Sequence, residues 1–340
     1  MKKMRALLLT ASAMLLAASC QLRPLCDPSE AVMIKVTVDT DGISNVTCDL
    51  YNPYISYETI STDMIRCMFY DPETGNLLSQ SFIENKSYNA KGQEVLSGTV
   101  NILSGNFDII CYSFDTPNTL VRDESAFSTI DAFSTEVSSS VVSRFSPLKA
   151  DVPTVYNTPD HLVVSRDLNY KVALHSELTT IETTARTCID TYYLQIHAKN
   201  ANRAGAINAV LTGLSGDNKF ALDERNANPS MAYFDLQVSK DDQRYGNEDN
   251  AVICAVFNTF GKIEASNSQL HIYATTTSGK VVEKTYSMDE IFATADAQNH
   301  HWLFIDEEFE FPQEDDPKPG GGGFNPEVGE WEEEHGEITL

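Results

Sequence analysis

Val32-Met-Ile-Lys-Val-Thr-Val38 is the stretch of the sequence that most directly decides the fold. Every second residue from Val32 to Val38 carries a branched apolar side chain, and Met33, Lys35 and Thr37 alternate with them. A period of two is typical of a β-strand that has one face against a core and the other toward solvent. The stretch therefore predicts a half-buried strand.

The same alternation recurs along the first half of the chain, between residues that favour turns. Asp71-Pro-Glu-Thr-Gly75 has Pro and Gly where a turn needs them, and Ser104-Gly-Asn106 is a second turn. No long helical periodicity lies between these segments, and strands separated by turns at this spacing predict a β-sandwich. We expect strands at Val32–Val38, Ile65–Tyr70, Leu77–Ile83, Val100–Leu103 and Phe107–Phe114.

A segment rich in Ser, Thr, Asp and Pro, residues 115–160, indicates a domain boundary. We expect an N-terminal sandwich over 31–155 and a C-terminal sandwich over 156–312, each long enough to bury its own core. Gly213 to Gly216 indicates a loop, and Ser287-Met-Asp-Glu290 has the spacing of a capping box that begins a short helix. We expect further strands at Val141–Phe145, Tyr170–Leu174, Tyr192–Ile196, Ala251–Phe257, Leu270–Ala274, Lys280–Lys284 and Trp302–Phe311.

Residues 1–19 have the layout of a secretory signal peptide, with basic residues before a short apolar run. The run is too short to span a bilayer, which takes about 20 apolar residues. Ala17-Ala-Ser directly precedes Cys20, and a cysteine after small residues is typical of a bacterial lipobox. We therefore predict that Cys20 is the acylated N-terminus of the mature protein and begins a tether over 20–30. The alternative is an ordinary signal peptide with an incidental cysteine nearby.

The chain is strongly acidic, with a formal net charge of −25. Removal of Lys2, Lys3 and Arg5 with the signal peptide makes the charge −28. Such a chain repels the phosphates of nucleic acids, so we expect no nucleic acid among its partners. The same repulsion argues against binding to anionic lipid through a basic patch.

Residues 313–340 are predicted to form a hinge and an acidic tail. Gly320 to Gly323 and the nearby prolines break regular structure. A purely solvating tail would carry no tryptophan, whereas this one carries several apolar residues. It therefore indicates a detachable strand that adds to a partner, with a frayed tail as the alternative. The predicted partner-binding residues are Phe324, Trp331, Ile338 and Leu340.

Enzyme motifs are absent from the sequence, which has no GxSxG, HExxH, Walker or GxGxxG pattern. Paired carboxylates carry no information in a chain this acidic. His300 and His301 are adjacent, and neighbouring residues of a strand point to opposite faces, so the pair would chelate a metal poorly. We expect no enzyme activity, no metal site and no cofactor.

Six cysteines remain once Cys20 is acylated, and an exported protein with six cysteines allows fifteen disulfide connectivities. Cys67, Cys111 and Cys254 each lie inside an alternating strand pattern, where cysteine often acts as a small core residue. No paired spacing such as CxxC is present for zinc. We expect few or no structural disulfides.

Tyrosines are plentiful, and exposed aromatic side chains bind sugars. A glycan-binding surface lipoprotein is therefore the alternative function. Such tyrosines more often fill the core and edges of a β-sandwich. The residues concerned are Tyr51, Tyr54, Tyr57, Tyr192 and Tyr193.

Several short segments follow one another along nearly the whole mature chain: Cys20-Gln-Leu-Arg-Pro-Leu-Cys26, Met64–Gly75, Ser104–Thr116, Tyr156-Asn-Thr-Pro-Asp160 and Phe324–Leu340. In this order they resemble the fimbrillin-like fimbrial anchor lipoproteins of Gram-negative gut anaerobes, the type V pilus class. Ser104-Gly-Asn106 departs from the family's pattern, because it lacks the usual proline before glycine.

The resemblance implies two tandem transthyretin-like β-sandwich domains with a C-terminal strand or tail after a Gly-rich hinge. It implies a fimbrial anchor or accessory subunit that assembles with other fimbrial subunits by β-strand addition. Gln21, rather than Asp, follows Cys20, and by resemblance to Gram-negative lipoproteins this favours the outer membrane. We therefore expect a lipid-anchored protein of the outer membrane, exposed at the cell surface.

Overall fold

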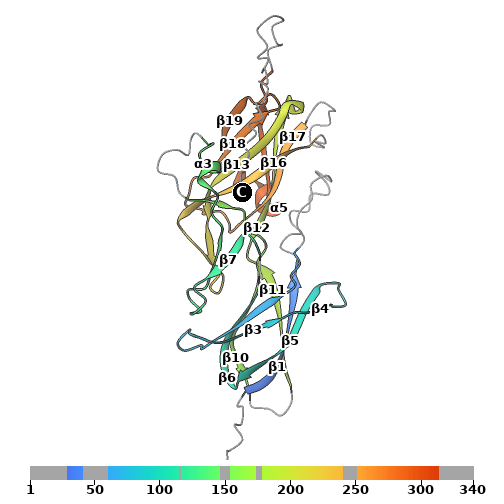
Figure 1. Ribbon diagram of the computed structural model, residues 1–340, viewed down its shortest axis with the longest axis vertical. Helices are drawn as coiled ribbons and strands as arrows, with labels where there is room; N and C mark the ends of the chain where they lie inside the picture. Colours follow the sequence, from blue (N-terminus) through green and yellow to red (C-terminus); the bar gives the residue numbers. More distant parts are fainter. Residues whose placement is uncertain are drawn as a thin grey trace, which may run out of the picture.

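The computed structural model describes residues 29–40, 60–114, 116–145, 154–173, 178–239 and 251–313. The chain is all-β, and its strands form two β-rich domains that follow one another along the long axis of the molecule (Figure 1). No helix within these ranges is both long and apolar enough to cross a bilayer. Cys20, the signal peptide and the tail residues Phe324, Trp331, Ile338 and Leu340 lie outside the described residues.

The first domain is an eight-stranded sheet in the order β3-β2-β6-β10-β11-β1-β5-β4. Neighbouring strands are antiparallel except β1 and β11, which run parallel. The alternating apolar residues of β1 are all fully buried in the core of this domain, which confirms the half-buried strand predicted there. The strands are β1 (Ser29–Asp39), β2 (Ile65–Tyr70), β3 (Leu77–Ile83), β4 (Asn85–Tyr88), β5 (Glu94–Leu103), β6 (Gly105–Ser113), β10 (Val163–Val172) and β11 (Thr179–Thr187).

The two edges of this sheet come together because one stretch of chain contributes to both. Only Glu84 separates β3 from β4, yet β3 pairs with β2 and β4 pairs with β5. At the end of β3, Ile83 lies so close to β5 that a Cβ atom on Gly98 would be 2.8 Å from its Cγ2 atom. The first domain is therefore a nearly closed barrel around a hydrophobic core.

The second domain is a sheet in the order β19-β18-β13-β16-β17-β12-β20, with β9 paired to β16. Two short helices, α4 (Asp289–Phe292) and α5 (Ala295–His300), bury Phe292 and Ala297 in its core. A 3-10 turn, η2 (Ala201–Arg203), precedes β13. The strands are β9 (Val155–Asn157), β12 (Asp190–Lys199), β13 (Ala204–Ser215), β16 (Pro229–Ser239), β17 (Ala251–Thr259), β18 (Gln269–Thr276), β19 (Val281–Ser287) and β20 (Trp302–Glu310).

A four-stranded sheet in the order β15-β14-β8-β7 joins the two domains. Its strands are β7 (Thr119–Arg122), β8 (Asp131–Ser134), β14 (Asp217–Lys219) and β15 (Glu224–Arg225). Successive side chains of β2 and β6 point alternately into the barrel and to its outer face. The four-stranded sheet helps to bury the side chains on that outer face. The buried residues of this joining core are Met68, Tyr70, Ile110, Tyr112, Ile130, Ala132, Leu162, Val164, Ile189, Phe220, Ala221 and Phe260.

The boundary predicted at residue 155 does not coincide with the division between the sheets. β10 and β11 lie beyond that residue, yet they form the centre of the first sheet between β6 and β1. β9, near the predicted boundary, pairs with β16 of the second sheet. The weakly patterned segment 115–160 is therefore where the chain leaves the first sheet and returns to it, not where the first domain ends.

Two local predictions were wrong. Val141–Phe145 was expected to be a strand, but α3 (Ser139–Val142) ends within it and its turn is closed by hydrogen bonds to Ser138 and Ser139. Gly213 to Gly216 was expected to be a loop, but Gly213 lies within β13 at a φ of +79°. The register with β16 shifts there, which is a bulge that a glycine accommodates.

Two predictions near the end of the chain need a change of detail. A short helix does follow Ser287, but its N-cap position is Met288 and no side chain caps it, so the capping box does not form. His300 ends α5, and His301 occupies its C-cap in a left-handed conformation rather than a strand. The predicted last strand is confirmed as β20.

Candidate partner-binding groove

The barrel of the first domain has an open seam between β3 and β5. Within the described residues, β3 pairs only with β2, and β4 covers β5 only from Glu94 to Ser97. Residues 98–103 of β5 pair with β1 on one side and with no described strand on the other. Their outward backbone groups therefore face a gap between two strand edges, which is where a further strand can pair.

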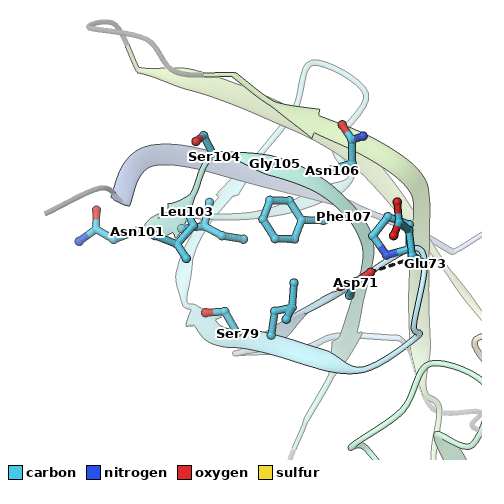
Figure 2. Close-up of a pocket in the computed structure, with 12 residues that line it drawn as sticks. Asp71, Glu73, Ser79, Asn101, Leu103, Ser104, Gly105, Asn106 and Phe107 are labelled. Atoms are coloured by element: carbon cyan, nitrogen blue, oxygen red, sulfur yellow. Dashed lines mark hydrogen bonds between the residues drawn. The ribbon is translucent and has the colours of Figure 1, made fainter.

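The seam widens into a groove with a volume of about 520 Å³. Leu78 and Ser79 of β3 line one side, and Asn101 and Leu103 of β5 line the other (Figure 2). Phe107 of β6 lies between the two sides, with its ring inside the groove. The groove therefore has an apolar floor and strand edges for walls.

Phe107 is a rigid floor because it belongs to the core. Only 4% of its surface is exposed, and its ring packs edge-to-face against that of Phe69, with 6.0 Å between the ring centroids. Ser104 alone separates β5 from β6, although these strands are not neighbours in the sheet. The chain therefore crosses the end of the barrel at this corner and closes the groove beneath the seam.

The two leucines that line the groove are exposed. Leu78 and Leu103 each have 56% of their surface in contact with solvent, so both can contact an occupant of the groove. The pairing register of β2 and β3 shifts at Leu78, so this residue sits at a bulge next to Ser79. A bulge redirects a side chain out of the regular alternation, and it places Leu78 in the lining of the groove.

The turn between β2 and β3 forms an acidic end of the groove. The Oδ1 atom of Asp71 accepts hydrogen bonds from the backbone N–H groups of Glu73 at 2.8 Å and Thr74 at 3.2 Å. These bonds fix the predicted turn Asp71–Gly75, in which Gly75 has a φ of +70°. Asp71 and Glu73 therefore face any occupant of the groove with negative charge (Figure 2).

The chemistry of the groove suits recognition of an extended peptide. It combines unpaired strand edges, an apolar hollow that accepts one or two side chains, and a polar rim. Strand addition uses these features, because backbone hydrogen bonds supply affinity and side-chain pockets supply specificity. No group of three or more His, Cys, Asp or Glu side chains placed to hold a metal occurs in the described part of the chain.

The sequence predicted the elements around the groove but not the groove itself. Ile65–Tyr70, Leu77–Ile83 and the turn at Asp71–Gly75 were predicted correctly, whereas of the predicted turn Ser104–Asn106 only Ser104 lies outside a strand, because Gly105 and Asn106 begin β6. Nothing in the pattern of these segments shows that β3 and β5 stay apart. The only signal for the groove in the sequence was that Leu78 and Leu103 each stand beside another apolar residue. The predicted partner-binding residues of the tail cannot be compared with the groove, because they lie outside the described residues.

The tyrosines behind the glycan-binding alternative are buried where the structure describes them. Tyr192 and Tyr193 lie in two separate clusters of buried residues in the second domain. The ring of Tyr192 stacks on that of His301, with 4.7 Å between the ring centroids. Neither presents an aromatic face to a polysaccharide. Tyr51, Tyr54 and Tyr57 lie outside the described residues.

Comparison with solved structures identifies the fold. A candidate adhesin from Bacteroides ovatus matches with a TM-score of 0.56 at 14% identity, over 88% of this chain and 98% of that protein. A second candidate adhesin from B. ovatus has a TM-score of 0.46 at 7% identity, over 84% and 89% of the two chains. The fimbrial anchor protein Mfa2 from Porphyromonas gingivalis has a TM-score of 0.46 at 10% identity, over 83% and 90%.

The first of these matches, with a TM-score of 0.56, confirms the predicted resemblance at the level of the fold, which is what similarity at 14% identity establishes. No curated protein matches the sequence. A family model described as "Domain of unknown function (DUF5119)" matches residues 57–235, which is more than half of the chain and includes both walls of the groove. The chain therefore belongs to the DUF5119 family.

Proposed function

We propose that this protein is a structural subunit of a surface fimbria, an anchor or accessory subunit rather than an enzyme, and that it assembles by β-strand addition. The observation that carries the proposal is the open seam between β3 and β5 above the floor made by Phe107. Similarity in fold to a protein named as a candidate adhesin supports a role at the cell surface.

The remaining parts of the proposal come from the sequence. Residues 1–19 direct export, acylation of Cys20 holds the protein to the outer membrane, and residues 20–30 form the tether. The family resemblance adds that the two β-rich domains, the first of them nearly closed into a barrel, are variants of a transthyretin-like fold. After the hinge, the tail residues Phe324, Trp331, Ile338 and Leu340 pair with a second subunit, while the groove receives a strand from another fimbrial subunit.

A pair of matched substitutions tests the groove in cells. Leu103→Asp adds a charge to the groove wall, and Leu168→Asp adds the same charge to a leucine of β10 that does not line it. The two leucines are 56% and 64% exposed, so neither change buries the new carboxylate in the core. We expect Leu103→Asp to reduce cell-attached fimbriae and Leu168→Asp to leave them unchanged, as counted by electron microscopy. Equal counts in both variants would exclude the groove.

Cys20→Ala tests the anchor separately. Without the acyl chains the protein loses its hold on the membrane, and we expect fimbriae to be shed into the medium or to become abnormally long. Immunoblots of the medium and the membrane fraction measure this directly. If fimbriae stay attached while the protein becomes soluble, the anchor role is wrong even where the groove variants behave as expected.

A further inference from the structure

Cys67 and Cys111 lie directly opposite one another on neighbouring strands in the first domain. Cys67 is on β2 and Cys111 on β6, and the pairing register of these antiparallel strands makes them partners. Their Sγ atoms are 3.4 Å apart, and both side chains are almost completely buried. Both thiols are free in the structure.

This position suits a cross-strand disulfide. Opposed residues of an antiparallel pair have Cα atoms about 4.5 to 5.5 Å apart, and disulfides need about 4.4 to 6.8 Å. The two sulfur atoms already face each other inside the core, so a small rotation of the side chains closes the remaining distance.

Other cysteines of the described chain do not compete for this pairing. Cys254 is buried in the second domain, where its thiol donates to the backbone oxygen of Gln237 at 3.6 Å. Cys188 packs against the joining core, on the outer face of the first sheet. Cys67 and Cys111 instead belong to the core inside the barrel. Among the described cysteines, the fold therefore selects one pair from the many that the sequence allowed.

We propose that Cys67 and Cys111 form a disulfide when the chain folds outside the cytoplasm. This rests on the export that is part of the proposed function, because disulfides persist in oxidising compartments. The oxidant is a disulfide-bonded thiol oxidoreductase. One thiolate attacks its disulfide to give a mixed disulfide, and the second thiolate then displaces the oxidoreductase. Each cysteine loses one proton, and the two electrons reduce the oxidoreductase to a dithiol.

The bond forms during folding rather than afterwards. The hydrogen bond with Cys111 and burial in the core raise the pKa of the Cys67 thiol well above its usual value. The thiolate is the nucleophile in disulfide exchange, so the folded and reduced protein reacts slowly. The same burial protects the finished bond from reducing agents.

The disulfide would link the strand that leads into the acidic end of the groove to the strand that carries its floor. β2 leads into the acidic turn at Asp71, and β6 carries Phe107. The contact between the rings of Phe69 and Phe107 lies on the same two strands. A covalent link between β2 and β6 therefore keeps the groove in shape when force on a fibre pulls at an added strand.

The test is a thiol-trapping experiment on the full chain, isolated from cells that export it. Cells are lysed in denaturant that contains a maleimide, so that buried free thiols are also blocked, and peptides are mapped by mass spectrometry without reduction. We expect a linked peptide containing Cys67 and Cys111, lighter by two hydrogen atoms than the reduced pair. Cys254→Ala should leave this peptide in place, and Cys67→Ala should abolish it and leave Cys111 modified by maleimide. Maleimide on both cysteines of the exported protein would overturn the proposal.

A second arm separates this result from the question of location and function. The purified full chain is reduced, unfolded in urea and refolded in a glutathione redox buffer, and a folded reduced sample receives the same buffer. We expect the linked peptide in the refolded sample and at least tenfold less of it in the folded one. Absence of the linked peptide after refolding overturns the proposal wherever the protein resides. If the linked peptide forms on refolding but cell fractionation finds the protein in the cytoplasm, the proposed export is refuted instead.

Discussion

At the scale of single residues, the closure of the barrel depends on Gly98. A Cβ atom there would lie 2.8 Å from the Cγ2 atom of Ile83 and 3.4 Å from its Cα atom. Ile83 is buried and cannot move away freely. We predict that Gly98→Ala lowers the free energy of unfolding by about 1–3 kcal/mol, because overpacking forces β3 away from β5. The midpoint of urea unfolding measures this loss.

Gly105→Ala is the matched control for Gly98→Ala. A Cβ atom on Gly105 would lie 3.5 Å from the ring of Phe107, which is an ordinary contact. Its φ is not in the left-handed region, so alanine fits the backbone, and we expect a change below about 1 kcal/mol. Equal losses in the two variants would mean that the contact between β3 and β5 does not set the cost.

His161 makes the stability of the protein depend on pH. Burial lowers the pKa of its imidazole from 6.5 to about 4, although the carboxylate of Asp160 acts in the opposite direction. Between these values the unfolded chain binds the proton and the folded chain does not, so stability falls as the pH drops below 6.5 and levels off below 4. We predict that lowering the pH from 7 to 5 costs about 2 kcal/mol through this residue.

Urea unfolding at pH 7 and pH 5 compares the wild type with His161→Gln and with His300→Gln. Glutamine at 161 can keep a hydrogen bond to the hydroxyl of Thr187, whose Oγ1 atom is 3.3 Å from the histidine ring. We expect the difference between the two pH values to shrink only in His161→Gln, since His300 is exposed. If His161→Gln loses as much stability as the wild type, the buried imidazole is not responsible.

At the scale of strands, the first sheet needs β10 and β11 between β6 and β1. A chain that stops at residue 155 lacks both and leaves the edges of β1 and β6 open. We predict that it shows no cooperative unfolding transition by circular dichroism. A chain that stops at residue 188 keeps all eight strands, and it should unfold cooperatively at a lower urea concentration than the full protein. A cooperative transition in the shorter chain would contradict this arrangement.

The strands also show how far the sequence could predict the fold. Strands rich in apolar residues were found from the sequence: β2 was predicted over its full length and β1 to within three residues at its start, whereas only the centre of β12, Tyr192–Ile196, was predicted. β11 was missed because Thr fills most of its positions and only Ile181 and Ala185 are buried apolar residues. β13 was missed because Gly205 and Gly213 suggest breaks, although Gly213 accommodates a bulge next to Ser268. Both β11 and β13 form because they pack closely against strands that are distant in the sequence.

The groove could not be predicted for a related reason. The pattern of β3 and β5 indicates which face of each strand is buried, but it does not show which edges pair. The single residue Glu84 turns the chain from one edge of the barrel to the other, and that change of partner leaves the seam open. Strand pairing of this kind is a property of the whole sheet.

At the scale of the whole molecule, the joining core makes the two domains depend on each other. Phe220 is fully buried there, its ring lies 5.2 Å from that of Tyr112, and its backbone oxygen accepts a hydrogen bond from Arg166. We predict that Phe220→Ala costs about 3–5 kcal/mol and separates one unfolding transition into two. Differential scanning calorimetry resolves the two steps, with Phe220→Leu as a milder control. A single transition of unchanged midpoint would show that Phe220 does not hold the domains together, and two transitions in the wild type would show that the domains are independent.

In our proposal the seam between β3 and β5 receives a strand from another fimbrial subunit. A photo-crosslinking amino acid placed at position 103, and in a second strain at position 168, tests it in intact cells. We predict a crosslink from position 103 to a fimbrial subunit, identified by mass spectrometry, and none from position 168. A crosslink to that subunit from position 168 but not from position 103, or from neither, would contradict the claim.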